Sequence, residues 1–138
     1  MLWVLLGFEA VGGLVIFFMR LAAGETPGEL LHICVGAVLL LLYVAYQWTH
    51  WSRVNPWRNR LDYVLGLIGA TSMSATLLTG YALAWRWWPL RITAHSHAVV
   101  DYPTIVSAAH NIMSMLVLTF VGAHLAVVLR RGLRGQRG

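Results

Sequence analysis

The chain has 138 residues, of which 59% are hydrophobic and only 11% carry a charge. A water-soluble domain usually has about 25% charged residues, so the composition excludes a soluble enzyme and predicts a single integral membrane domain over residues 1–138. All ten basic residues are arginines near the ends of apolar runs, so the net charge of +5 does not indicate nucleic acid binding.

Four apolar segments follow one another along the chain, at about residues 2–22, 29–51, 61–85 and 103–129. Each is near or above the roughly 20 residues that an α-helix needs to cross a bilayer. Helices are favoured because a spanning segment must satisfy its own backbone hydrogen bonds. The longest connection, about residues 86–102, contains Pro89. The sequence therefore predicts an all-α fold, an up-and-down bundle of four transmembrane helices.

The arginines also predict the orientation of the bundle. Four spans bring both termini to one side, and seven of the ten arginines lie on that side. By the positive-inside rule this distribution favours an N-in, C-in topology. The protein is then expected in the inner (cytoplasmic) membrane of a bacterium, in contact with membrane lipid, and the connection at 86–102 is expected on the outer side.

Two histidines mark the fourth apolar segment and two mark the second. His110 and His124 are 124 − 110 = 14 residues apart, which places them within roughly 40° of one helix face and about 21 Å apart along the axis. His32 and His50 are 50 − 32 = 18 residues apart, close to five whole turns and about 27 Å. Ionisable groups inside a membrane span usually face the bundle interior and a partner. Because these two helices run parallel, we predict the pairs His32–His110 in the outer half and His50–His124 in the inner half.

Each predicted pair supplies two imidazoles to one flat ligand, and histidine is a common axial ligand of haem iron. We therefore predict two b haems with these four histidines as iron ligands. Gly36 and Ser114 lie on the same faces as the histidines, and with Gly80 of the third helix they are expected to make room for the porphyrin. Arg20 is a candidate partner for a haem propionate, because a guanidinium matches a carboxylate.

Other interpretations of the histidines stay open. A histidine inside the membrane can simply hydrogen-bond to a neighbouring helix. A bare Zn²⁺ or copper site needs three or four ligands close together, often with a carboxylate or thiolate, and the two histidines of each helix are too far apart for that. His50 is 18 rather than 14 residues from His32, and Tyr46 occupies the position at 14. His50 could therefore be an interfacial residue, in which case a single haem is expected.

These motifs give the chain a resemblance to a known family. They are His110 and His124 with thirteen residues between them, His32 followed by Gly36, His50 followed by Trp51, and Thr79–Gly80. In these features the chain resembles the four-helix cytochrome b membrane subunits of formate dehydrogenases, NiFe hydrogenases and thiosulfate reductases, and the related stand-alone cytochromes b. The resemblance implies an electron-transfer subunit with two b haems, which connects a quinone pool to a partner redox protein or a larger oxidoreductase complex. Several members of this family carry a haem ligand on the first helix, where this chain has no histidine.

Four further polar residues are candidates for a quinone or partner site. His95, His97 and Asp101 lie in the outer connection, where the histidines could face a quinol or a docked protein and Asp101 could accept a proton. Asp101 is also placed to cap the fourth helix. Glu9 lies about three turns into the first helix and is expected near the inner haem, facing a quinone or a proton path.

The sequence leaves several functions open. The leading hypothesis is a haem-bearing electron-transfer subunit of an oxidoreductase complex. The alternative in the same class is a stand-alone cytochrome b that acts on quinone, superoxide or ferric iron. A cofactor-free membrane anchor and a small metal-ion transporter are the alternatives from other classes. The chain has almost no mass outside the membrane for a nucleotide or flavin site, so chemistry at either end is expected to need a partner or a small diffusing molecule.

Overall fold

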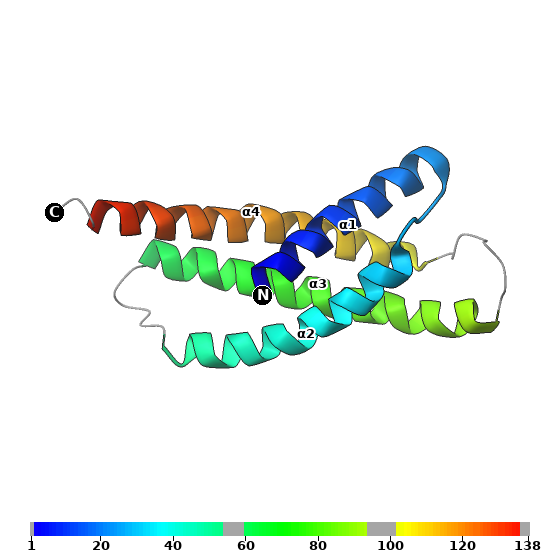
Figure 1. Cartoon of the computed structure of the whole chain (residues 1–138), viewed down its shortest axis with the longest axis horizontal. Helices are drawn as coiled ribbons and strands as arrows, with labels where there is room; N and C mark the ends of the chain where they lie inside the picture. The colour runs from blue at the N-terminus through cyan, green and yellow to red at the C-terminus, as the bar shows by residue number, and fades with distance from the viewer. Residues whose placement is uncertain (1, 54–59, 94–101, 136–138) are drawn as a thin grey trace.

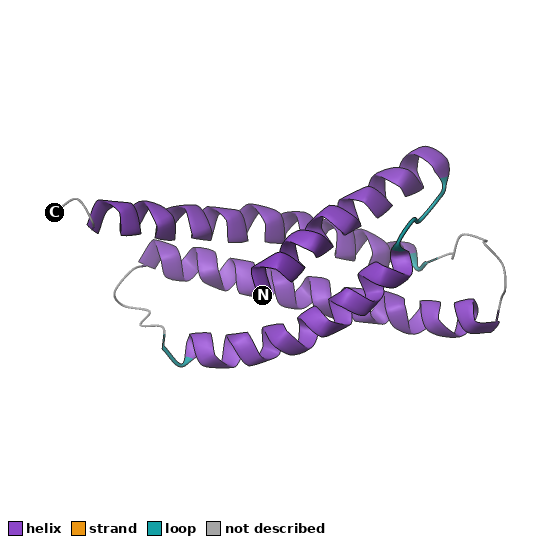
Figure 2. Cartoon of the chain, viewed as in Figure 1, coloured by secondary structure: helices purple, strands orange, loops and turns teal. Residues whose placement is uncertain are grey.

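Four long α-helices make up the protein (Figure 1). The computed structural model describes residues 2–53, 60–93 and 102–135. The helices are α1 (Leu2–Ala23), α2 (Glu29–Trp51), α3 (Arg60–Thr93) and α4 (Thr104–Gly135). Each contains a stretch long and apolar enough to cross a membrane. Within the described ranges all regular secondary structure is helical (Figure 2), so the predicted all-α, four-span membrane fold is confirmed.

The outside of the bundle is apolar and its buried core is small. Leu39, Met73 and Val117 from α2, α3 and α4 are buried together near the middle of the bundle. In contrast, large apolar side chains such as Leu41 and Ile105 are 73% and 84% exposed. A water-soluble protein rarely exposes apolar surface on this scale, whereas a bundle that spans a membrane does.

α3 and α4 lie side by side along most of their length (Figure 1). Small residues of α3 bring the two backbones together. A Cβ atom added at Gly69 would lie 3.3 Å from the Val121 side chain, and one at Gly66 would lie 3.4 Å from the His124 ring. The contacting positions on α3 follow each other at steps of three and four residues, which keeps them on one helix face. They are Gly66, Gly69, Met73, Thr76 and Gly80.

The turn between α1 and α2 depends on two glycines. Gly24 has φ 69° and its N–H donates to the carbonyl of Arg20 at 3.1 Å, which is the left-handed ending common at helix C-termini. Gly28 has φ 74° and precedes α2, where its carbonyl accepts from the N–H of His32 at 2.9 Å. Both positive φ values favour glycine over any residue with a Cβ.

Polar side chains tie the start of α4 to this turn. The Tyr102 hydroxyl donates to Glu29 Oε1 at 2.7 Å, and the Thr26 hydroxyl donates to Glu29 Oε2 at 3.2 Å. The Arg20 guanidinium lies 5.3 Å from the centre of the Tyr102 ring. The three helices α1, α2 and α4 are therefore joined at this end of the bundle, one turn from His32.

α3 and α4 extend beyond the spans predicted from the sequence. α3 continues to Thr93 through Pro89, eight residues past the predicted end at 85, and α4 continues to Gly135 rather than 129. The apolar part of α3, Tyr63–Trp85, does match the predicted span. Loss of apolar character therefore marks where a span ends, but not where the helix ends. Pro89 does not end α3, because a proline removes only one backbone hydrogen-bond donor. The residues beyond the apolar span can stay helical because helix propensity does not depend on a bilayer.

Candidate functional site

His32 and His110 face each other across the bundle. They come from α2 and α4, and the centres of their rings are 6.4 Å apart with an angle of 80° between the ring planes. The structure thus brings together the two histidines that the sequence placed in the outer half. This is an edge-on arrangement, within the range of ordinary aromatic ring contacts.

The surroundings of His110 fix which of its nitrogens carries the proton. Nδ1 lies 3.0 Å from the carbonyl oxygen of Thr76 and 3.2 Å from the Thr79 hydroxyl oxygen, both on α3. A carbonyl oxygen can only accept, so Nδ1 carries the hydrogen and donates it. In a neutral imidazole Nε2 is then the atom with the free lone pair. The ring rests on Gly80, where a Cβ would lie 3.0 Å from its Cε1 atom.

His32 is held in the same way, but by a carboxyl group. Its Nδ1 lies 2.8 Å from Glu9 Oε2 on α1, and the two side chains are 23% and 11% exposed. The ring packs on the backbone of Gly12 and Gly13, where added Cβ atoms would lie 3.8 Å from Nδ1 and 3.3 Å from Cε1. The contact is a close charge contact, and Nδ1 of His32 has no hydrogen-bond partner among the described residues.

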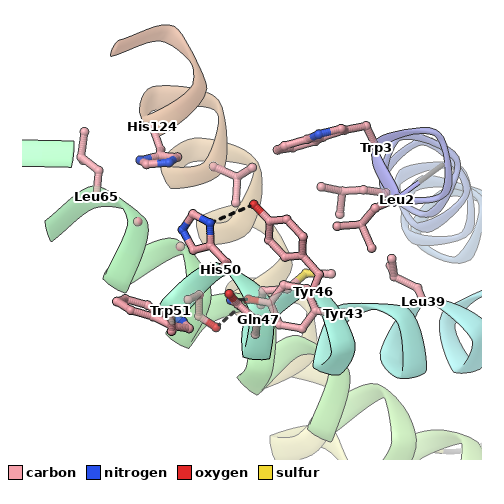
Figure 3. A pocket seen from close by; sticks show the side chains of 16 residues that line it. Leu2, Trp3, Leu39, Tyr43, Tyr46, Gln47, His50, Trp51, Leu65 and His124 are labelled. Carbon is pink, nitrogen blue, oxygen red and sulfur yellow. Dashed lines mark hydrogen bonds between the residues drawn. The ribbon is translucent and has the colours of Figure 1, made fainter. Parts of the chain in front are cut away.

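His50 and His124, the second predicted pair, line one cavity. The cavity has a volume of about 80 Å³ and is bordered on the α1 side by Leu2 and Trp3 (Figure 3). The His50 ring stacks on Tyr46, with 5.3 Å between ring centres, and the Tyr46 hydroxyl lies 3.4 Å from Nδ1 of His50. Pockets that enclose small-molecule ligands and cofactors usually have about 300–1,000 Å³, so this cavity is small for a porphyrin.

The other predicted cofactor contacts have more local partners. Gly36 faces Glu9, since its added Cβ would lie 3.4 Å from Oε2. The Ser114 hydroxyl donates to the carbonyl of His110 at 2.7 Å. Gly80 supports the His110 ring, and Arg20 covers the Tyr102 ring. These residues hold the histidines and the helix ends around the first pair.

Four residues were assigned to a quinone or partner site, and the structure describes one of them. Glu9 was expected near the inner pair, and that placement was wrong because it contacts His32 of the outer pair. The reason is the position of α1, whose first turns pack on the buried core in the middle of the bundle. Its third turn therefore reaches the depth of His32. His95, His97 and Asp101 lie outside the described residues.

Two sequence signals for these contacts were missed. Gly66 and Gly80 are 80 − 66 = 14 residues apart on α3, the same separation as His124 and His110 on α4, and each glycine lies against one of these rings. Glu9, with Gly12 and Gly13 three and four residues later, forms one face of α1. All three residues contact His32.

Comparisons with models of known protein families, with curated proteins and with solved structures return no match. In the described part of the chain, no three histidine, cysteine, aspartate or glutamate side chains gather closely enough to bind a metal ion by themselves. The donors there come as imidazole pairs, which is the donor set of a six-coordinate haem iron rather than of a tetrahedral Zn²⁺ site.

Proposed function

We propose that this protein binds haem b between His32 and His110 and carries electrons through the membrane, between a quinone pool and a partner redox protein. The observation that supports this most directly is the arrangement of the two imidazoles. They come from two helices that run parallel, and their rings meet edge-on. Behind the rings, Nδ1 of His110 donates to a carbonyl of α3 and Nδ1 of His32 lies beside a carboxyl group of α1.

The two rings would hold the iron through one nitrogen each, since histidine is a common ligand of haem iron. The ring centres of His32 and His110 are 6.4 Å apart. The donor chemistry also suits iron, because a ligating histidine usually donates its other N–H to a carboxylate or a backbone carbonyl.

Each neighbouring residue has a role in this proposal. Glu9 and the Thr76 carbonyl orient the two ligands, and Gly13 and Gly80 let the rings lie close to the backbones of α1 and α3. The apolar side chains of the bundle exclude water from the site. Bound haem supplies reversible transfer of single electrons, which no side chain of the protein provides by itself.

The pair His50–His124 is the proposed second haem site. Its support is weaker, because the cavity between the two side chains is small and Tyr46 occupies one face of His50. Two haems at different depths would let electrons cross the bilayer, whereas one would connect a single side to the quinone pool. The number of haems per chain therefore decides between transmembrane transfer and transfer at one surface.

The first prediction is that the protein, purified in detergent, shows a sharp α-band in its reduced-minus-oxidised absorption spectrum. We expect His32→Leu and His110→Leu each to remove the same haem, because each leaves one imidazole unpaired. The double variant should lose no more haem than either single variant. Pyridine haemochrome analysis measures the haem content of each polypeptide.

A matched control for these variants is Met115→Leu, which changes an exposed side chain of the same helix. It should keep the haem content of the unchanged protein. A folded protein without colour would reject the proposal in favour of a cofactor-free anchor. Isolation from its native membrane, alone or with a large subunit, separates a stand-alone oxidoreductase from the subunit of a complex.

A further inference from the structure

The carboxyl group of Glu9 lies inside the first span, where an ionisable group needs a strong reason to be present. Its side chain is 11% exposed, and Oε2 lies 2.8 Å from Nδ1 of His32. Oε1 is buried and has no hydrogen-bond partner among the described residues. Placing a carboxylate at membrane depth is costly, and such residues are usually functional. If the side chain only had to support the ring, a neutral acceptor would be enough, as the Thr76 carbonyl is for His110.

We propose that Glu9 is a positioning residue that sets the reduction potential of the haem bound by His32. This inference rests on the proposed function. Glu9 Oε2 lies 2.8 Å from Nδ1 of His32, so its negative charge lies beside the ring that would hold the iron. A carboxylate next to an imidazole makes the ring a stronger donor to a metal than a neutral group does.

The direction of the effect follows from the charges. The iron–porphyrin core of a bound haem, without its propionates, would carry one positive charge in the ferric form and none in the ferrous form. A nearby carboxylate and a more basic ligand both favour the ferric form, so they lower the reduction potential. The two proposed ligands differ, because His110 donates to the Thr76 carbonyl and His32 lies beside the carboxyl group of Glu9. Glu9 is therefore the group whose replacement should raise the potential.

The test is a potentiometric titration of the purified haem protein, followed through its α-band. Glu9→Gln keeps a carbonyl acceptor and removes the negative charge. We expect it to retain haem and to favour the reduced form about tenfold, which for a single electron is about 59 mV. Glu9→Asp keeps the charge and should stay closer to the unchanged protein. A titration in the His124→Leu background assigns the shift to the haem held by His32.

Glu25→Gln is the matched control, because it makes the same chemical change at an exposed position after α1. It should leave the potential unchanged. If Glu9→Gln binds haem and titrates as the unchanged protein does, the inference is wrong while the proposed function stands. If Glu9→Gln loses the haem and Glu9→Asp keeps it, the carboxylate is required for the ligand's position. A protein that binds no haem even without substitution rejects the proposed function instead.

Discussion

The orientation of the His32 and His110 rings depends on the contacts of their Nδ1 atoms with α1 and α3, rather than on the contact between the two rings. His110 donates to a backbone carbonyl of α3, and His32 lies against a carboxyl oxygen of α1. A buried nitrogen without such a partner would cost about 1–3 kcal/mol. The contacts therefore stabilise the fold and orient both Nε2 atoms at the same time.

Glycine at position 80 is needed because the His110 ring leaves no room for a Cβ atom. In Gly80→Ala the added Cβ would lie 3.0 Å from Cε1 of His110, so the ring must move. We predict that haem binding at the outer site weakens about tenfold, or about 1.4 kcal/mol, in a titration of the haem-free protein with haem. Gly122→Ala is the control, since its Cβ would meet no atom within 4 Å. Equal affinity in the two variants would contradict this arrangement of the site.

The helices form two similar pairs, each with a glycine-bearing helix beside a histidine-bearing helix. α1 places Gly12 and Gly13 against His32, and α3 places Gly80 against His110. In both cases the first helix of the pair also provides the polar group beside Nδ1, the Glu9 carboxyl in α1 and the Thr76 carbonyl in α3. The sequence twice places a segment with glycines before a segment with two histidines, and at the outer site this order has a structural counterpart.

The pairs are joined at one end through Tyr102, whose hydroxyl donates to Glu29 at the start of α2. Tyr102→Phe removes this bond and keeps the ring that faces Arg20. We predict a loss of about 1.5–3 kcal/mol in stability, as for other hydrogen bonds to charged groups, measured as a lower midpoint of thermal unfolding in detergent. Tyr81→Phe is the control, because Tyr81 is 57% exposed. An equal loss in both variants would show that Tyr102 does not hold the helices together.

The bundle has two ends (Figure 1). The α1–α2 turn and the start of α4 lie at the first end, and the last residues of α2 and α4 lie at the second end. The arginine distribution predicts that the second end faces the cytoplasm. In a Cys34→Ser background, a membrane-impermeant maleimide should label Glu25→Cys in intact cells. It should label Ser52→Cys only after the membrane is opened. Both positions are exposed, so access depends on the side of the membrane. The reverse labelling pattern would invert the proposed topology.

The sequence by itself determined the four spans and the approximate depth of each histidine. Apolar length and the 3.6-residue period are local properties, so they can be recognised in a short stretch of sequence without knowing which helices pack beside it. The same period predicted that His32 and His110 would come from one level of two parallel helices. The ends of α3 and α4 were not predictable from apolar length, because both helices continue into less apolar sequence.

Only the tertiary structure decided what holds each imidazole. The Thr76 carbonyl and His110 are 34 positions apart in the chain, and Glu9 meets His32 because α1 starts at the level of the central core. Helix tilt and depth depend on how side chains pack between helices, and no short-range pattern encodes them. For the same reason the sequence could pair His50 with His124, but only the packing showed a small cavity there with Tyr46 on one face of His50.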